Sequence, residues 1–194
     1  MPEGPEVHTI ADWLASQIIG DTLVEVSYTP TSRYAKKGIP RLEELNRSLP
    51  LDVIDVDAKG KKIIFLVAPS KGAATTPDQL GQSNQEEQYF LVSSLMMEGK
   101  WTWEKGKHSD LYFDLLSPQG DKRRLYFDDS RHFGTFEIFD QVNTFLDRLK
   151  EIGPDLITDE ITESEWLSKI RNKRLKKKKI GLFLMEQKYF SGIG

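Results

Sequence analysis

The 194-residue sequence contains no cysteine. This absence excludes a disulfide framework and every zinc site that is built on thiolates. Histidine is also scarce, because the chain has only His8, His108 and His132, and these lie far apart in the sequence. A histidine-rich metal centre therefore has too few candidate ligands. We expect neither a metal ion nor a cofactor.

Long hydrophobic runs are missing as well. Apolar runs such as residues 63–68 are much shorter than the about 20 residues that a membrane-spanning helix needs. The amino-terminal sequence Met-Pro-Glu-Gly-Pro-Glu is acidic and rich in proline, which is the opposite of a secretory signal peptide. We therefore predict a soluble, intracellular protein that does not bind membranes.

The chain has no overall excess of positive charge, because 27 Lys and Arg residues face 30 Asp and Glu residues and the net charge is −3. That balance by itself argues against a nucleic-acid-binding protein. Residues 171–179 are the exception, since seven of these nine residues are Lys or Arg. Binding to phosphates depends on local positive density rather than on total charge. The segment is either a nucleic-acid contact or a solvated helix face, with about even weight on each.

The apolar pattern begins with a helix and continues with strands. Apolar residues at helical spacing predict a helix over residues 5–19, which Pro5 would begin and Gly20 would end. From residue 24 to residue 139, alternating and continuous apolar segments predict strands, interrupted by a polar loop or insertion at 69–88. We expect an antiparallel β-sandwich with the first helix packed on one edge.

After Val142 the pattern becomes helical. Helices are predicted at residues 143–152, after a capping box formed by Thr162 and Glu165, and at residues 179–187. A turn is also expected inside the strand region, at residues 117–121. We place a domain boundary near residues 140–150. The predicted fold class is α+β, with a sandwich domain over 1–140 and a helical region over 141–194.

Candidate chemistry is concentrated at the amino terminus. Removal of Met1 is expected because the second residue is small, and it would leave Pro2 with a free secondary amine. The pKa of an α-amino group is about 7.7–8.0, so part of it is nucleophilic at neutral pH. Glu3 and Glu6 lie one helical turn apart and could transfer a proton and hold a water or hydroxyl. The alternative is that both glutamates only complement the helix dipole, and this segment alone favours that alternative.

Residues 1–7 resemble the amino terminus of the formamidopyrimidine-DNA glycosylase and endonuclease VIII (Fpg/Nei) family. Three further segments match in the same order: 59–61 the hairpin lysine motif, 95–99 the loop with a void-filling Met, and 129–134 the Asp-Pro-Arg-Arg-Phe-Gly loop. The final residues, 184–194, are similar to the entry of a helix-two-turns-helix motif. The Lys-Gly-Lys and Tyr-Phe-Ser-Gly-Ile-Gly sequences are closer to the Nei-like branch than to bacterial Fpg, and they suggest a giant-virus member.

The resemblance implies a bifunctional enzyme of base excision repair. Such an enzyme is a DNA glycosylase and a DNA-(apurinic or apyrimidinic site) lyase, which excises an oxidised base and then cuts the strand by β,δ-elimination. The Nei-like sequences favour oxidised pyrimidines. The resemblance implies four catalytic residues: Pro2 would form a Schiff base with C1′, Glu3 would be the general acid, Glu6 would assist at the sugar, and Lys61 would bind the phosphate beside the lesion.

The same resemblance implies contacts with damaged DNA, double- or single-stranded, made by a monomer in the nucleus or cytoplasm. A base must leave the stack before its sugar can be attacked. Met97, Arg131 and Phe133 would fill the gap that it leaves, and Lys188, Gly192 and Gly194 would contribute DNA contacts from the helical region. Taken singly, Met97 is more typical of a core, Phe133 of a strand and Lys61 of a solvated cluster. The four motifs in order favour the functional assignments.

Two departures from the family pattern qualify the assignment. Ser130 and His132 replace the Pro and Arg of the family loop, and we interpret His132 as a structural residue that points into the sheet. His8 contacts either the DNA backbone or other parts of the protein. The family continues past Gly-Ile-Gly into a phosphate-binding Asn and a finger, so we expect residues 141–194 to be a truncated DNA-binding region.

Three hypotheses follow. The leading one is a glycosylase and lyase. The second is a non-catalytic DNA-binding remnant of the same family without the carboxy-terminal finger. The third is an unrelated β-sandwich interaction protein in which Pro2 has no chemical role.

Overall fold

The described chain begins with a 15-residue helix, α1 (Gly4–Ile18). The computed structural model describes residues 2–70, 88–171 and 179–193. Pro5 lies in the first turn of α1, and the Glu6 carboxylate accepts the backbone N–H of Glu3 over 2.9 Å, which caps the helix. Gly20 adopts a φ of +86°, a conformation that glycine reaches without strain. The helix predicted over residues 5–19 is therefore confirmed, with each end displaced by one residue.

In the described residues, eight strands form one antiparallel sheet. Along the sheet they run in the order β5-β7-β6-β1-β2-β3-β4-β8. The strands are β1 (Thr22–Tyr28), β2 (Leu51–Lys59), β3 (Lys62–Ala68), β4 (Tyr89–Ser94), β5 (Lys100–Thr102), β6 (Ser109–Leu116), β7 (Lys122–Asp128) and β8 (Thr135–Phe139).

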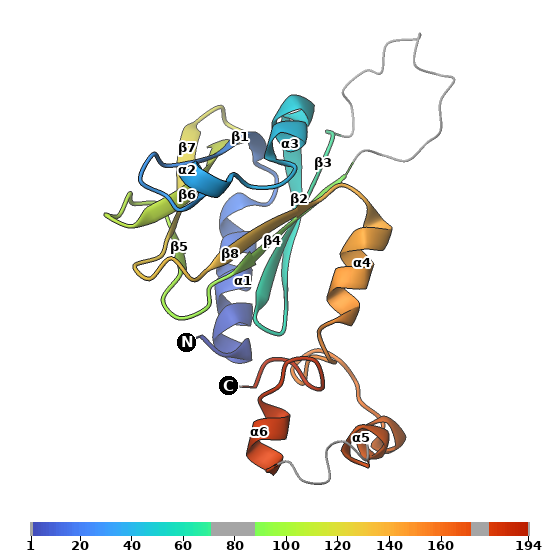
Figure 1. Ribbon diagram of the computed structural model, residues 1–194. Coiled ribbons are helices and arrows are strands. Elements are labelled where there is room, and N and C mark those ends of the chain that lie inside the picture. The colour runs from blue at the N-terminus through green and yellow to red at the C-terminus, as the bar shows by residue number, and fades with distance from the viewer. Residues whose placement is uncertain (1, 71–87, 172–178, 194) are drawn as a thin grey trace.

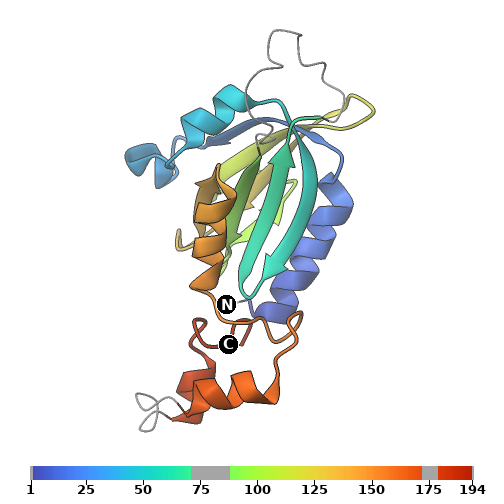
Figure 2. The same cartoon turned by 90° about the vertical axis from the view of Figure 1, so that its right-hand side faces the viewer.

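The sheet folds over on itself and its inner faces pack together. The ring of Phe65 on β3 lies 5.2 Å from that of Trp101 on β5 and 5.3 Å from that of Phe113 on β6, both edge to face. Neither strand is a hydrogen-bonded neighbour of β3, so these contacts cross the interior. The expected sandwich is confirmed, and its layers are two halves of one sheet. Helix α1 runs alongside β2 and β3 (Figure 2) and buries its apolar stripe in the same core.

Two short helices between β1 and β2 were not predicted from the sequence. They are α2 (Tyr34–Lys37) and α3 (Leu42–Ser48). The side chain of Asn46 on α3 bonds to both the N–H and the C=O of Val26, at 3.1 and 2.9 Å. That pair of bonds fixes α3 to β1. Of the loop predicted at residues 69–88, residues 71–87 lie outside the described part of the chain.

The turn predicted at residues 117–121 is confirmed. The backbone N–H of Ser117 donates to the carbonyl of Asp121 over 2.9 Å, and Gly120 has a φ of +92°. This tight turn joins β6 to β7 as a hairpin.

The helical region contains α4 (Val142–Lys150), α5 (Glu163–Ile170) and α6 (Ile180–Leu184). The capping box of Thr162 and Glu165 is confirmed, with the two reciprocal bonds at 3.3 and 2.9 Å. Helix α6 is shorter than the predicted 179–187. Helix α4 stacks Phe145 on Phe90 of β4, with ring centroids 4.0 Å apart, and so packs on the sheet. None of the helices in the described ranges is long and apolar enough to cross a membrane.

Candidate functional site

Three segments that are distant in sequence meet at the amino-terminal end of α1 (Figure 1). They are α1 itself, the turn between β2 and β3, and residues 187–193. The backbone N–H of Gly4 donates to the carbonyl of Gly192 over 2.7 Å, and a Cβ on Gly4 would lie 2.7 Å from the Gly192 Cα. Gly60 in the β2–β3 turn has a φ of +59°, and a Cβ there would lie 2.6 Å from the Cβ of Ser191. Glycine is required at both contacts because a side chain would collide.

Asp155 connects the same three segments from inside. Its side chain is completely buried and accepts the backbone N–H groups of Gly60 and, at 3.0 Å, Ile157. His8 Nε2 lies 2.9 Å from Asp155 Oδ2. Burial acts to raise the pKa of Asp155, but the hydrogen bonds from His8, Ile157 and Gly60 outweigh it and lower the pKa. Of the two alternatives for His8, the structure therefore supports an internal contact.

The three candidate catalytic residues at the amino terminus differ in their exposure and contacts. Pro2 is partly exposed, and Glu3 and Glu6 are exposed. The Glu6 carboxylate accepts the Glu3 N–H, which fits the helix-dipole alternative for Glu6. Burial lowers the pKa of Lys61, and the charge of Glu3 opposes this effect in part. Residues 3 and 61 are 58 positions apart in sequence, and the junction between α1, residues 191–192 and the β2–β3 turn places them in the same part of the molecule.

Lys61 follows Gly60 and is partly buried. Burial lowers the pKa of Lys61, and the charge of Glu3 opposes this effect. The amine therefore lies in a less polar environment than a solvated lysine, where a phosphate would interact with it more strongly. The neighbouring Lys62 points elsewhere, and burial lowers its pKa too.

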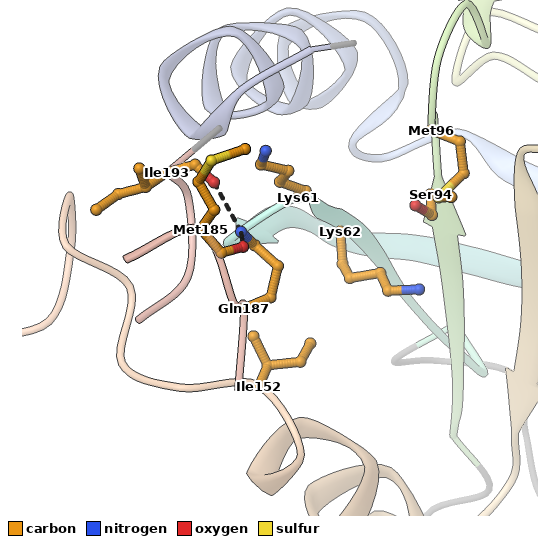
Figure 3. Close-up of a pocket in the computed structure, with 8 residues that line it drawn as sticks. All are labelled: Lys61, Lys62, Ser94, Met96, Ile152, Met185, Gln187 and Ile193. Carbon is orange, nitrogen blue, oxygen red and sulfur yellow. Dashed lines mark hydrogen bonds between the residues drawn. The ribbon is translucent and has the colours of Figure 1, made fainter. Parts of the chain in front are cut away.

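A cavity of about 270 Å³ lies between the sheet and the carboxy-terminal segment (Figure 3). Figure 3 shows the Lys61 side chain directed toward α1, whereas Lys62 extends away from α1, toward the strand that carries Ser94. Met96 belongs to the loop that also carries Met97, so this loop and Lys61 border one cavity. The lining residues are Lys61, Lys62, Ser94, Met96, Ile152, Met185, Gln187 and Ile193.

Gln187 shapes the carboxy-terminal wall of this cavity. Its Oε1 accepts the backbone N–H of Gly192 over 3.0 Å, and its Nε2 donates to the carbonyl of Ile193 over 2.7 Å. The sequence reasoning missed Gln187, although it lies inside the matched segment 184–194. Lys188 is exposed and its amine lies 3.3 Å from the Glu186 carboxylate. Gly192 contacts Gly4, and Gly194 lies outside the described residues.

The candidate void-filling residues project from two loops that touch each other. Met97 is 38% exposed and Phe133 54% exposed, so Met97 is not a core residue and Phe133 lies in a loop rather than a strand. Glu98 joins the loops: its carboxylate accepts from Ser130 Oγ and lies 3.3 Å from Arg131 Nε. Met97, Arg131 and Phe133 are therefore exposed side chains on two loops that Glu98 joins.

The His132 side chain is directed toward the sheet. Its Nδ1 lies 2.9 Å from both carboxylate oxygens of Asp110, a buried residue at the start of β6. The structural interpretation of His132 is confirmed by this contact. Of the basic segment 171–179, residues 172–178 lie outside the described part of the chain. Within the described ranges, no group of three or more Asp, Glu or His side chains could hold a metal ion.

Comparison with known sequences identifies relatives along the whole chain. A family model described as the formamidopyrimidine-DNA glycosylase N-terminal domain matches residues 1–136. The formamidopyrimidine-DNA glycosylase of Lactococcus lactis subsp. lactis is 28% identical over 197 residues, and that of Mycoplasma pneumoniae is 31% identical over 201 residues. Each alignment covers 100% of this chain and 63% of the relative. The chain thus spans somewhat less than two thirds of the length of these relatives.

Solved structures agree with the sequence relatives. MutM in complex with DNA that contains carbocyclic 8-oxo-G has a TM-score of 0.74 and 26% identity, and the match covers 100% of this chain and 65% of that one. Lactococcus lactis Fpg in complex with abasic-site DNA has a TM-score of 0.66 and 25% identity, with coverage of 99% and 62%. Both proteins are similar to this chain over nearly its full length.

Proposed function

Because the chain belongs to the formamidopyrimidine-DNA glycosylase family, we propose that it is a DNA glycosylase and AP lyase that acts on damaged DNA in base excision repair. The observation that carries this proposal is the junction that holds the first turn of α1, next to Pro2 and Glu3, against residues 191–192 and the β2–β3 turn that carries Lys61, beside a cavity shared with the Met97 loop. The similar MutM and Fpg proteins that were solved with damaged DNA support the same substrate class.

In the proposed mechanism, removal of Met1 frees the amine of Pro2, which attacks C1′ of the damaged nucleotide and forms a Schiff base as the base departs. Glu3 supplies the proton for opening of the sugar ring and for later transfers. Lys61 binds the phosphate beside the lesion. Glu6 assists at the sugar, and its bond to the Glu3 N–H also fixes the orientation of the first turn. β,δ-Elimination then cuts the strand.

The DNA contacts follow from exposure and position. Met97, Arg131 and Phe133 would enter the gap left by the extruded base, since a flexible thioether, a planar guanidinium and an aromatic ring can replace lost stacking. Lys188 is exposed and is proposed to contact the DNA backbone from the carboxy-terminal segment. Gly192 is buried, and its N–H and carbonyl are bonded to Gln187 and Gly4, so it holds this segment in place instead. A DNA contact by Gly194 stays a prediction. Oxidised pyrimidines are the proposed lesions. If a panel of lesion duplexes were cleaved only where it contains 8-oxoguanine, that preference would be contradicted.

Borohydride trapping on an oligonucleotide with an abasic site tests the central step, because reduction of a Schiff base leaves a stable protein–DNA bond. We expect a covalent band for the wild type and a much weaker one for Pro2→Gly, whose primary α-amine lacks the ring that fixes the amine of proline. Glu3→Gln should abolish base excision while leaving attack on a preformed abasic site partly intact. DNA binding without any trapping, in protein whose mass shows Pro2 exposed, would favour the non-catalytic remnant instead.

The third hypothesis, an unrelated interaction protein, is wrong because the chain belongs to the family. The Nei-like branch and a viral origin stay predictions, as does the boundary near residues 140–150.

A further inference from the structure

The Arg33 side chain forms hydrogen bonds with the backbone on both sides of Phe133. Its Nη1 donates to the carbonyl of His132 over 2.6 Å, and its Nη2 donates to the carbonyl of Gly134. The two acceptors are the residues immediately before and after Phe133, and they lie 99 and 101 positions from Arg33 in sequence. The guanidinium therefore fixes the backbone on either side of Phe133, while the ring of Phe133 stays exposed.

Arg33 is itself held firmly by the fold. It directly precedes α2, and its Nη2 also donates to the hydroxyl of the buried Tyr34 over 2.8 Å. The Tyr34 backbone N–H in turn donates to Ser32 Oγ over 3.1 Å, and Ser32 is buried as well. A rigid base of this kind limits the rotamers of the arginine, so that its planar fork is already oriented toward the loop.

The loop needs such support because its conformation is costly. His132 has a φ of +54°, which is unfavourable for a residue with a Cβ. On the inner side, the buried Asp129 carboxylate accepts the backbone N–H groups of Gly134, at 2.6 Å, and Arg131, at 3.1 Å. The Asp129 carboxylate thus accepts two backbone N–H groups of the loop, and the Arg33 guanidinium donates to two of its carbonyls. A negative and a positive side chain together hold residues 129–134.

We propose that Arg33 is a positioning residue that keeps Phe133 in the orientation needed to enter a DNA duplex. The inference rests on the proposed function, because it assigns to Phe133 the gap left by an extruded base. A loop that is ordered before binding avoids the entropy cost of ordering it during insertion. Arg33 does not contact DNA in this role and acts only through the backbone of residues 132 and 134.

The structural part of the proposal is tested without any reaction. Amide hydrogen exchange is measured for residues 130–134 in the wild type, Arg33→Gln and Arg33→Lys. Gln lacks the charged fork and Lys cannot reach two carbonyls with parallel donors, so both variants should exchange faster in this loop, Gln the more so. Arg123→Gln is the matched control, since Arg123 is a half-buried arginine that bonds to the Gln17 carbonyl and to Asp21. Unchanged exchange in the Arg33 variants would overturn the proposal.

The functional part compares two substrates. Arg33→Gln should lower excision from a damaged duplex by about tenfold, the size expected for loss of a charged hydrogen bond. Trapping on an abasic site in single-stranded DNA should stay unchanged, because no stack has to be filled there. General destabilisation would lower both activities, and Arg123→Gln shows how large that effect is. Equal losses on the two substrates would contradict a positioning role.

A double-mutant cycle identifies the residue through which Arg33 acts. If Arg33 works through Phe133, then adding Arg33→Gln to Phe133→Ala should cause little further loss of duplex excision. Fully additive losses would overturn the assignment. If the wild type is inactive on every substrate, the proposed function is wrong, and the role of Arg33 is then decided by the exchange experiment and by the affinity of its variants for damaged duplex.

Discussion

The N–H of Gly4 and the carbonyl of Gly192 are joined over 2.7 Å, and this bond links the first turn of α1 to the carboxy-terminal segment. Gly192 explains why residue 4 is a glycine, since a Cβ on Gly4 would lie 2.9 Å from the Gly192 oxygen and 2.7 Å from its Cα. The Gly in Pro-Glu-Gly-Pro-Glu is therefore a packing requirement. The proposed chemistry of this sequence belongs to Pro2, Glu3 and Glu6.

Gly4→Ala should destabilise this junction. The added methyl group must displace backbone atoms, so we expect a loss of about 1–3 kcal/mol in the free energy of unfolding, measured by chemical denaturation. Gly181→Ala is the matched control, because nothing lies within 4 Å of a Cβ there and Gly181 is on α6. The control should be neutral or slightly stabilising. Similar losses in the two variants would show that the junction is not specifically affected.

Asp155 should make stability depend on acid pH. Its pKa in the folded protein lies below the ordinary value of 3.8, so its stabilising effect is complete above about pH 4 and is lost as the pH falls through the folded value. Asp155→Asn should lower the free energy of unfolding at pH 7 by about 1–3 kcal/mol and flatten its decline between pH 5 and 2. Asp147→Asn, in an exposed pair with Lys150, should keep the wild-type slope. If the free energy of unfolding of Asp155→Asn fell with pH in parallel with that of the wild type, Asp155 would not be the source of this pH dependence.

The titration of Lys61 should respond to the charge of Glu3. Burial lowers the pKa of Lys61 and the charge of Glu3 raises it, so Lys61 should lose its proton below pH 10.5, and at a still lower pH in Glu3→Gln. The chemical shift of the Lys61 Cε carbon, followed by NMR against pH, measures both values. A pKa that is unchanged or higher in Glu3→Gln would mean that the two side chains are not coupled.

Met97→Ala and Phe133→Ala should weaken binding to damaged duplex more than binding to undamaged duplex. Both side chains act after the base has left the stack, and stacking on an aromatic ring contributes about 1–3 kcal/mol, so a loss of about tenfold or more is expected for Phe133. Dissociation constants for matched damaged and undamaged duplexes give the ratio. Val24→Ala, an exposed apolar residue on β1, serves as the control. Equal weakening on the two DNAs would argue against insertion.

Local patterns in the sequence predicted the elements whose signal is local. The helical stripe of α1, the capping box before α5 and the turn at residues 117–121 all depend on residues within one or two turns of each other. Helices α2 and α3 were missed because they are short, and α3 is fixed by a distant bond from Asn46 to Val26. Strand positions were predicted, but their order in the sheet depends on contacts that a local pattern does not contain.

The residues of the candidate site divide in the same way into those with a local sequence signal and those without one. Ordered motifs identified Lys61, which lines the cavity, and Met97 and Phe133, which are exposed on two loops. Residues that hold these motifs in place were not identified. Asp155 contacts Gly60 across 95 positions and Arg33 contacts the Phe133 loop across about 100. A buried acid after Gly-Pro, or an arginine before a short helix, has no distinguishing local signal.

In the part of the chain that the structure describes, the sheet ends in two edge strands, and their lengths have a consequence for self-association. β5 has only three residues, and β8 has five, with α4 packed near it through Phe139 and Phe145. An edge strand offers unpaired backbone donors and acceptors to another chain, and short edges offer few of them. Two copies of the protein therefore have few backbone groups with which to pair their sheets edge to edge. This favours a monomer even at high concentration.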